Sequence, residues 1–404
     1  MSKTLLLLGG ARYALPVIDA AHDLGVRVVT CDYLPDNYAH RFSDGYVNAS
    51  ITDNDAVLAA AESVEADGIM SFAADPGVVS AAYAAEKLEL PFQGSYEAVS
   101  ILQDKERYRS FLRDNGFNCP DLHIYRSADE AMAEADEISY PVIAKPVDAA
   151  GSKGCARVDG PGGLHAAVEY ALSFSRDGRC IVEQFLEKSG DSSDADGFLI
   201  DGEFKCVSFT SQLFDASVPN PYTPAAYAMP ASMPRWAQNE LISELQRMAD
   251  LLRLESGVFN IETRVASDGK AYIMESSPRG GGNRLCEMLR FATGGKVDLI
   301  RASVQAALGM PVDALAAPAY DGFWYQQMLH SDHAGTFCGI EYAPGFREAH
   351  IAEEQLWVEP GDRVEAFSAA NHAFGSVFLR FEAESDLEEF RAAPDEFLKI
   401  KVDD

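Results

Sequence analysis

The sequence predicts an α/β protein: an N-terminal doubly wound parallel α/β domain, then a two-lobed α+β region, then a small strand-rich C-terminal region. Strand-like apolar runs alternate with amphipathic helix-like runs up to about residue 95, a pattern typical of parallel sheets. Paired strand-like runs around Asp-Gly turns follow, and strand-like runs punctuated by Gly and Pro begin near residue 318. Because 404 residues exceed what one hydrophobic core supports, we predict several domains. Their predicted ranges are 1–95, 96–180, 181–317 and 318–404.

The first segment, TLLLLGGARYALPVIDAAHDLGVRVVTCD, predicts a strand, a glycine turn, a helix and a second strand. A dinucleotide site would need G-x-G-x-x-G in this turn, but Arg12 and Tyr13 stand where small residues are required. Asp32, at the end of the second strand, occupies the usual ribose-binding position of such folds. An aspartate there also simply ends a strand, and we favour that interpretation.

The charge balance limits the classes of partner. The chain has 33 Lys and Arg against 63 Asp and Glu, a formal net charge of -30. Such a chain repels nucleic acid and anionic membranes, so we predict neither as a partner. We interpret the acidic excess as a solvated surface. An anionic ligand would then have to be held by local cations.

The cysteines and the apolar runs indicate a cytoplasmic protein. Seven cysteines occur without a C-x-x-C pair, which predicts reduced thiols and no structural zinc. The apolar run Leu5–Leu8 is too short for a signal peptide, and no run approaches the ~18 residues of a membrane span.

Several elements are expected in the middle of the chain. Residues 95–115 predict one helix, and GFLIDGEFKCVSFTSQLF predicts a hairpin that turns at Asp201-Gly202. The proline-rich residues 218–234 predict a long loop, a flap in which Tyr222 and Tyr227 line a substrate pocket. One acidic helix near residues 385–398 is expected to end the chain.

Two carboxylates indicate a metal site. Glu262 and Glu275 lie on two strand-like runs joined by Asp268-Gly269, and a short hairpin would bring them together on one face. Ser277 lies two residues beyond Glu275, hence on the same face. Their apolar flanks favour burial, which is costly for an unpaired carboxylate. We therefore predict a magnesium site with these three oxygen ligands, rather than two solvated acids.

A glycine-rich loop follows a strand that carries Lys145. The backbone N–H groups of Gly151-Ser152-Lys153-Gly154 can form a nest around an oxyanion such as a phosphate. The segment is not a P-loop, because G-x-x-x-x-G-K-[ST] is absent. By itself the loop fits an ordinary flexible hairpin equally well.

The order of these features resembles the ATP-grasp superfamily. Lys105 on a helix, Lys145 on a strand, the glycine-rich loop, the strand Ile181–Leu186 and the two-acid hairpin follow the order of that family. The resemblance implies a domain preceding ATP-grasp in residues 1–95. It also implies a small lobe in residues 96–180 and a large lobe with the metal site in residues 181–317.

The last motif of that family reads approximately E-x-N-P-R, with another acid about 13 residues upstream. Glu275 and Pro278-Arg279 match it, and Glu262 precedes Glu275 by 275 − 262 = 13 residues. Ser277 departs from the motif, since the family has asparagine there. A serine hydroxyl offers one oxygen at shorter reach, so we expect a second metal to bind more weakly or through water.

The resemblance implies that the nucleotide is ATP and that the metal is Mg²⁺, with Mn²⁺ as an alternative. The matching lysines of this chain would contact the phosphates, and the glycine-rich loop would close over them. The strand would face adenine, and a later acid would hold the ribose. The residues implied are Lys105, Lys145, Gly151, Ser152, Lys153, Gly154, Glu183, Gln184, Phe185, Leu186 and, for the ribose, Asp191.

The resemblance also implies a ligase that activates a carboxylate as an acyl phosphate and joins it to an amine, with an amino acid or a similar small molecule as substrate. Arg279 and Lys145 would be catalytic, Arg279 through paired N–H donors to the phosphoryl group. The substrate carboxylate would bind the free N–H groups at the N-terminus of the helix that follows the glycines, which leave room for its approach. The expected substrate residues are Arg264, Gly281, Gly282, Asn283 and Arg284.

Alternatives stay open at this stage. Surface salt bridges explain Arg264 and Arg284 equally well. The nucleophile could be a thiol or bicarbonate instead of an amine, and a nucleotide-binding protein without turnover is an alternative from another class. Members of the family are often dimers, so a homodimer is compatible with the resemblance.

Overall fold

The computed structural model describes residues 2–149 and 152–403. Its contacts divide the chain into two compact units, each discontinuous in sequence. The first unit comprises residues 1–119, 194–208 and 234–318, and the second comprises residues 120–193, 209–233 and 319–404. The four continuous domains expected from the sequence stay a prediction.

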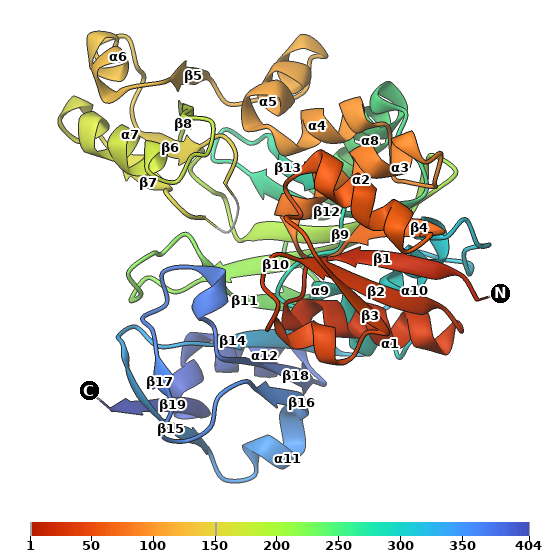
Figure 1. Cartoon of the computed structure of the whole chain (residues 1–404). Coiled ribbons are helices and arrows are strands. Elements are labelled where there is room, and N and C mark those ends of the chain that lie inside the picture. The colour runs from red at the N-terminus through yellow and green to blue at the C-terminus, as the bar shows by residue number, and fades with distance from the viewer. Residues whose placement is uncertain (1, 150–151, 404) are drawn as a thin grey trace. The chain divides into compact units, whose positions relative to one another are not determined.

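The first unit begins with the predicted parallel α/β domain. Its four-stranded sheet has the order β3-β2-β1-β4, with parallel pairing throughout. Helix α1 covers one face of the sheet, while α2 and α3 pack together on the other (Figure 1). The elements are β1 (Thr4–Leu8), α1 (Leu15–Asp23), β2 (Arg27–Asp32), β3 (Gly45–Asn48), α2 (Asn54–Ser63), β4 (Gly68–Ser71) and α3 (Val78–Lys87).

Asp32 has a structural role at the end of β2. Its carboxylate accepts hydrogen bonds from the backbone N–H groups of Gly10 and Leu34 and from the side-chain amide of Asn37. These bonds hold the glycine turn and the loop after β2 together. They agree with the interpretation of Asp32 as a residue that ends a strand.

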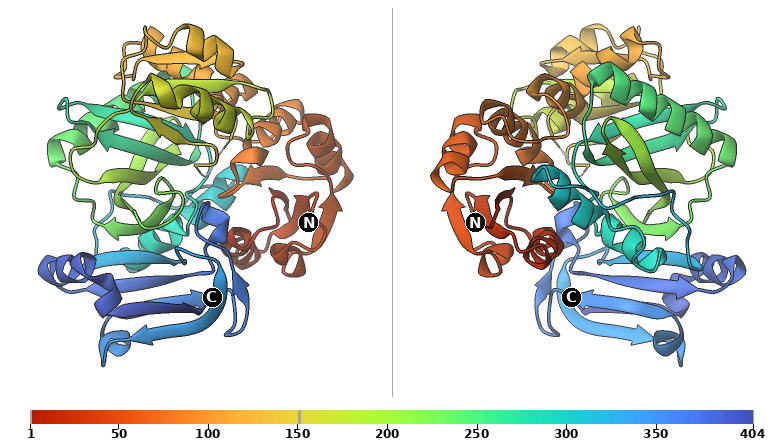
Figure 2. Two further views of the ribbon diagram at one scale, coloured as in Figure 1. Left: turned by 90° about the vertical axis from the view of Figure 1, so that its left-hand side faces the viewer. Right: turned by 90° about the vertical axis from the view of Figure 1, so that its right-hand side faces the viewer.

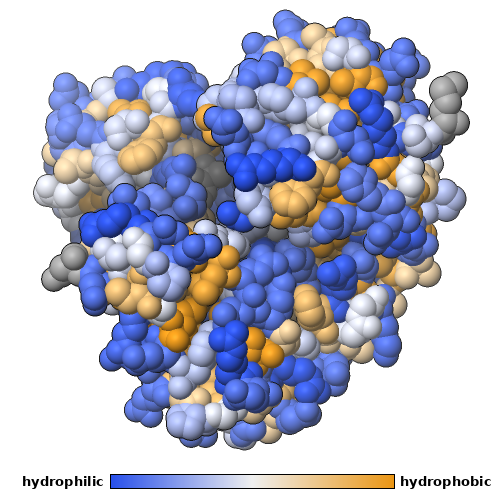
Figure 3. Space-filling view, turned by 60° about the horizontal axis from the view of Figure 1, so that its bottom comes forward, coloured by the Kyte–Doolittle hydropathy of each residue, from blue (hydrophilic) through white to orange (hydrophobic). Residues whose placement is uncertain are grey.

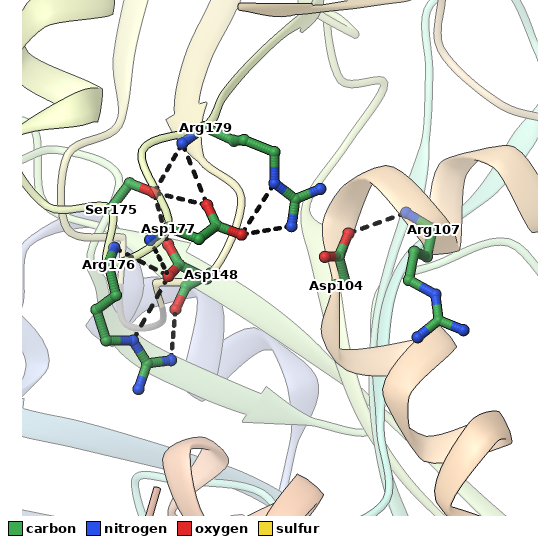
Figure 4. A network of polar contacts seen from close by, with 7 residues as sticks. All are labelled: Asp104, Arg107, Asp148, Ser175, Arg176, Asp177 and Arg179. Carbon is green, nitrogen blue, oxygen red and sulfur yellow. Dashed lines mark hydrogen bonds and ion pairs between the residues drawn. The ribbon is translucent and has the colours of Figure 1, made fainter. Parts of the chain in front are cut away.

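The single helix predicted over residues 95–115 is two helices, α4 (Tyr96–Gln103) and α5 (Lys105–Asp114). Asp104 separates them because its backbone is extended and its carboxylate accepts a hydrogen bond from the Arg107 N–H, capping α5 (Figure 4). The expectation of one continuous helix was wrong, since periodicity alone does not reveal an internal cap. Lys105 is consequently the first residue of α5.

The rest of the first unit contains antiparallel strands in the order β13-β12-β9-β10. The predicted hairpins turn at Asp201-Gly202 and near Gly269. Gly202 and Gly269 have positive φ, which glycine adopts without strain. The elements are β9 (Ser192–Ile200), β10 (Glu203–Phe214), α8 (Arg235–Leu252), β12 (Gly257–Val265), β13 (Ala271–Ser277), α9 (Leu285–Ala292) and α10 (Leu299–Ala307). β9 and β10 extend beyond this unit at one end.

The second unit contains a small antiparallel sheet of order β5-β8-β6-β7. Helices α6 and α7 pack on each other, and α7 also packs on β6, around a core that includes Tyr125, Leu164 and Val182. The elements are β5 (Leu122–Tyr125), α6 (Ala128–Ala133), β6 (Val142–Pro146), β7 (Ala156–Val158), α7 (Leu164–Leu172) and β8 (Cys180–Gln184).

The second unit also contains strands in the order β10-β11-β14-β18-β16 and a three-stranded sheet of order β17-β15-β19. Figure 2 shows the C-terminal strands, in blue, side by side in both views. The elements are β11 (Pro224–Met229), β14 (Phe323–Leu329), β15 (Gly335–Tyr342), α11 (Phe346–His350), β16 (Ile351–Leu356), β17 (Arg363–Val364), β18 (Gly375–Phe381), α12 (Glu384–Ala392) and β19 (Leu398–Asp403).

Two expectations for this unit were wrong. Residues 218–234 are not a continuous flap, because β11 pairs with both β10 and β14 and Tyr227 is only 2% exposed. The terminal helix stops at Ala392, two residues before Pro394, which cannot continue a helix, and the chain then forms β19. Partner strands distant in sequence decide the first outcome, and a local proline decides the second.

The surface and the cysteines agree with the composition. The face shown in Figure 3 is mostly hydrophilic, with apolar residues in small groups. The seven cysteines are free thiols, of which Cys31, Cys180, Cys206 and Cys286 are buried. Over residues 2–149 and 152–403, no helix combines the length and the apolar character that crossing a membrane requires.

Candidate active site

The first unit places the two predicted metal-binding acids opposite each other. Glu262 on β12 and Glu275 on β13 are directly paired in the antiparallel register, and Asn260 pairs with Ser277 two positions away. The register shifts next to the Glu262 pair, where β13 has one extra residue, Met274. Because side chains alternate between faces, the two glutamates share a face with Asn260 and Ser277.

This arrangement suits a hard cation that brings further ligands with it. Among the described residues, no group of three or more His, Cys, Asp or Glu side chains could hold a metal ion on its own. Mg²⁺ commonly binds through one or two carboxylates together with substrate phosphates and water. Glu262 and Glu275 fit that donor set, and their role as ligands stays a prediction.

Ser277 has two polar partners in the first unit. Its hydroxyl donates to Asp75 Oδ1 at 2.8 Å and accepts from Gln103 Nε2 at 2.7 Å. One lone pair of the hydroxyl oxygen is therefore available to a metal. The sequence did not predict either partner, since both lie in the N-terminal third of the chain.

Arg279 is the buried cation next to these acids, with a side chain that is 11% exposed. Its Nε and Nη2 donate to the two carboxylate oxygens of Asp75, each at 2.8 Å, and Nη1 donates to Asn260 Oδ1 at 2.7 Å and to the Gly280 carbonyl. The edge of the guanidinium that could have given paired N–H donors to a phosphoryl group is thus occupied by Asp75.

Electrostatics keep Asp75 ionised. Burial acts to raise the pKa of Asp75, but the charge of Arg279 and the hydrogen bonds from Arg279 and Ser277 hold it below its ordinary value. The charge of Lys105 acts in the same direction, so the first residue of α5 belongs to the same neighbourhood.

Two buried acids near Arg279 were missed by the sequence analysis. Asp194 and Asp196 lie on one face of β9, and the Asn260 amide donates to Asp194 Oδ1 at 2.7 Å and to Asp196 Oδ1 at 3.2 Å. Burial, followed by the charges of Asp196 and Glu262, raises the pKa of Asp194 well above its ordinary value. Two acids spaced by two residues in a buried strand were the signal that could have revealed them.

The glycines after Arg279 permit close packing. The Gly281 N–H donates to Asp196 Oδ1 at 2.9 Å, and a Cβ at this position would lie 2.8 Å from the same oxygen. A Cβ at Gly280 would lie 2.4 Å from Phe72. Gly282 has open space around it, so close packing requires glycine only at Gly280 and Gly281.

In the second unit, Lys145 on β6 forms an ion pair with Glu183 on the adjacent β8. The Glu183 side chain is 1% exposed and that of Lys145 is 16% exposed. Gln184 is exposed and Leu186 is buried. The lysine predicted to bind phosphate and the acid predicted to lie near adenine are therefore direct partners.

Hydrogen bonds hold the segment before the glycine-rich loop and one described residue within it. Gly151 lies outside the described residues. Before the loop, the Asp148 carboxylate accepts hydrogen bonds from the Ser175 hydroxyl and the Arg176 N–H (Figure 4). Within it, the Ser152 hydroxyl donates to the Tyr222 carbonyl at 2.9 Å. Lys153 is exposed, and Gly154 has a φ of +71°.

Residues 138–287 match the family model of the ATP-grasp domain. This chain contains an ATP-grasp domain. The chain is similar to the carbamoyl phosphate synthase large chain of Thermotoga neapolitana, with 26% identity over 218 residues, which are 54% of this chain and 19% of that protein. It therefore spans about a fifth of the length of that relative.

A second relative is matched over most of its length. The formate-dependent phosphoribosylglycinamide formyltransferase of Synechococcus sp. is 25% identical over 351 residues, 84% of this chain and 85% of that protein. Among solved structures, the L-amino acid ligase of Bacillus licheniformis superposes with a TM-score of 0.80 at 20% identity, covering 100% of this chain and 99% of that chain. The expected fold class is confirmed.

The ATP-grasp domain contains most of the predicted site residues. Lys105, like Asp75, precedes the matched range. Asp191 lies within it, where its Oδ2 accepts from the Ser232 hydroxyl and from Arg391 Nη2, each at 2.9 Å. Arg264 is opposite Tyr272 in the hairpin. The roles proposed for Asp191 in ribose binding and for Arg264 in substrate binding stay predictions.

A small cavity lies beside the glycines of the ATP-grasp domain, within the first unit. Its empty space is about 190 Å³, part of it open to solvent. The Arg284 guanidinium, 3% exposed, pairs there with both carboxylate oxygens of Glu287. Arg284 is the N-cap of α9, and both Asn283 and Arg284 have positive φ. The cavity is lined by Tyr13, Phe72, Ala73, Gly281, Arg284, Cys286, Glu287 and Ile300.

Proposed function

We propose that this chain is an ATP-dependent ligase that activates a carboxylate as an acyl phosphate and joins it to an amine, releasing ADP and phosphate. The observation that carries the proposal is the direct pairing of Glu262 with Glu275 in an ATP-grasp domain, with buried Arg279 following on the same strand end. Two carboxylates and a guanidinium are the groups needed to hold Mg²⁺ and a transferring phosphoryl group.

The triphosphate requires local cations, because the chain has a net charge of -30. Lys105 and Lys145 are the lysines proposed to supply them, and the N–H groups of the loop Ser152–Gly154 would supply donors. Lys145 would then share its charge between Glu183 and phosphate. Glu183 sets the position of the ammonium group, since it lies on the adjacent strand.

Magnesium would be bound by Glu262 and Glu275, with Ser277 as a third oxygen donor and the nucleotide phosphates completing the set. When bound, Mg²⁺ neutralises the phosphates and polarises the phosphorus–oxygen bonds. Mn²⁺ has similar ligand preferences and is an alternative.

The reaction has two displacement steps. A carboxylate oxygen of the substrate forms a bond to the γ-phosphorus, and the bond between that phosphorus and the oxygen that bridges to the β-phosphate breaks, releasing ADP. The amine nitrogen then bonds to the carbonyl carbon, inorganic phosphate leaves, and the nitrogen loses a proton. Arg279 would stabilise the oxyanions that develop in both steps.

The cavity beside α9 supports a small molecule as a substrate. It contains one buried cation, Arg284, one buried acid, Glu287, and the phenol of Tyr13. Burial raises the pKa of Tyr13 to about 12, with smaller opposed contributions from Arg284 and Glu287, so this phenol is a neutral hydrogen-bond donor. An amino acid or a similar compound carries charges complementary to those of Arg284 and Glu287. A homodimer forms part of the same proposal.

A coupled assay tests the proposal. Purified protein with Mg²⁺ and ATP is mixed with a matrix of carboxylates and amines, and ADP release is measured. We expect release that depends on one carboxylate and increases with an amine. Release with a thiol or bicarbonate in place of the amine would identify another nucleophile. ATP binding without ADP release in any combination would contradict the ligase function and favour a nucleotide-binding protein.

A further inference from the structure

We propose that Asp75 is a positioning residue of the reaction, which acts by orienting Arg279. This inference rests on the proposed function, since it concerns the arginine that would stabilise the reacting oxyanions. Asp75 lies outside the residues that match the ATP-grasp domain, at the start of a short 3₁₀ turn, Asp75–Gly77, that follows β4. The N-terminal α/β domain would thereby contribute a side chain to catalysis.

The contact between the two residues is bidentate and largely shielded from solvent. Arg279 Nε lies 2.8 Å from Asp75 Oδ1, and Nη2 lies 2.8 Å from Oδ2. The two side chains are 11% and 19% exposed. A planar guanidinium held by two parallel hydrogen bonds has its orientation fixed as well as its position.

The count of N–H donors shows what this orientation leaves available. An arginine has five, of which Nε and one of Nη2 are taken by Asp75, and both of Nη1 by Asn260 Oδ1 and the Gly280 carbonyl. Within the described residues, one N–H on Nη2 keeps no partner. Arg279 would therefore present a single, directed donor to a reacting oxyanion.

A second set of contacts fixes Asp75 itself. Its Oδ1 also accepts from the Ser277 hydroxyl, and that hydroxyl accepts from Gln103 at the end of α4. Asp75 therefore bridges Ser277 and Arg279 at the end of β13. The first is the proposed metal ligand, and the second is the proposed donor to the reacting oxyanion.

A double-mutant cycle separates positioning from stability. Asp75→Asn keeps the size of the side chain and removes its charge, and Arg279→Lys keeps the charge and removes the planar fork. We expect Asp75→Asn to lower kcat about a hundredfold, with KM for ATP almost unchanged, as for a lost oxyanion donor. In the Arg279→Lys background the same change should have almost no further effect.

Asp313→Asn is the matched control, because Asp313 forms an exposed ion pair with Arg301 in the same unit. We expect it to leave kcat unchanged. Full additivity in the cycle, or an Asp75→Asn enzyme that is folded and as active as the wild type, would overturn the inference.

A second measurement does not depend on turnover. In protein labelled with ¹⁵N-arginine, the Nε–H resonance of Arg279, assigned by its loss in Arg279→Lys, should be protected from solvent exchange. We expect that protection to disappear in Asp75→Asn and to persist in Asp313→Asn. An unchanged resonance in Asp75→Asn would overturn the inference. A wild type that shows the protected resonance but releases no ADP would contradict the proposed function and leave the orienting contact established.

Discussion

Glu262 and Glu275 occupy directly opposed positions on β12 and β13, so two carboxylates share one face of a hairpin. Opposed like charges destabilise a strand pair unless a cation or a proton intervenes. The pairing is therefore one that a bound metal would stabilise. It makes the hairpin the first place to test the proposed function.

Glu275→Gln should abolish ADP release while the protein remains folded. The amide keeps the shape of the side chain but is a much weaker ligand for a hard cation than a carboxylate. The measurements are the coupled ADP assay and circular dichroism. Retained turnover in this variant would remove Glu275 from the metal site. Glu203→Gln, an exposed acid at the start of β10, serves as a control that should keep full activity.

Glu262→Gln should stabilise the metal-free protein by ~0.2–1 kcal/mol, because it removes the repulsion between opposed carboxylates. The same change should reduce the stabilisation that Mg²⁺ and a nucleotide give together, since that stabilisation depends on metal affinity. Urea unfolding in the presence of EDTA, and then with Mg²⁺ and a non-hydrolysable ATP analogue, measures both effects. A variant less stable than wild type in EDTA would show that the two carboxylates are not in conflict.

Lys145→Met should destabilise the protein by ~3–5 kcal/mol, because it leaves Glu183 buried without its cation. The double variant Lys145→Met with Glu183→Gln should recover most of that loss, since no buried charge remains. ATP binding should stay weak in both variants if Lys145 contacts phosphate. Urea unfolding and calorimetric titration with ATP separate the two roles. Wild-type affinity in the double variant would exclude Lys145 from the nucleotide site.

Ser277→Ala should raise the Mg²⁺ concentration needed for half-maximal ADP release, because it removes one oxygen donor. Gln103→Leu removes a neighbour of the same hydroxyl without removing the oxygen, and should change the Mg²⁺ requirement less. Titration of activity with Mg²⁺ at saturating ATP compares the two. Equal effects of both changes would show that Ser277 acts through its hydrogen bonds and not as a ligand.

The acid stability of the second unit should depend on Asp215. The hydrogen bond with His330 and those from Ser217 lower the pKa of Asp215, although burial opposes them. A carboxyl whose folded pKa is lowered contributes stability that is present above its ordinary pKa of about 3.9 and is lost as pH falls towards the folded value. Between pH 5 and pH 2, the free energy of unfolding should therefore fall more steeply in wild type than in Asp215→Asn.

A matched control for this prediction lies in an exposed pair of the same type, Asp332 with His333. Asp332→Asn should follow the wild-type pH dependence, which urea unfolding at a series of pH values measures. Identical slopes for wild type and Asp215→Asn would show that the buried pair contributes no acid-dependent stability.

Much of the site could be predicted from local pattern. A short hairpin with period-2 alternation sets which residues share a face, so the pairing of Glu262 with Glu275 followed from the sequence between them. The alternation of strands and helices up to about residue 95 predicted the parallel sheet for the same reason, since each step is local. The order of motifs was enough to indicate an ATP-grasp domain.

Contacts between distant residues could not be predicted. Asp75 and Arg279 are separated by 204 positions, and Asp191 and Arg391 by 200. Any of the 63 acids was a candidate partner for a buried arginine. The sequence predicts a loop that includes residues 224–229, where the structure has β11, because the strands that pair with them lie elsewhere in the chain.

The sequence by itself determined which groups are available, in what order, and which of them share a strand face, because backbone geometry fixes these within a few residues. Only the tertiary structure decided that Asp75 occupies the paired edge of Arg279, that Glu183 neutralises Lys145, and that Asn260 links Arg279 to Asp194. The physical reason is that a buried charge must be satisfied, and the packing of elements distant in sequence selects the partner.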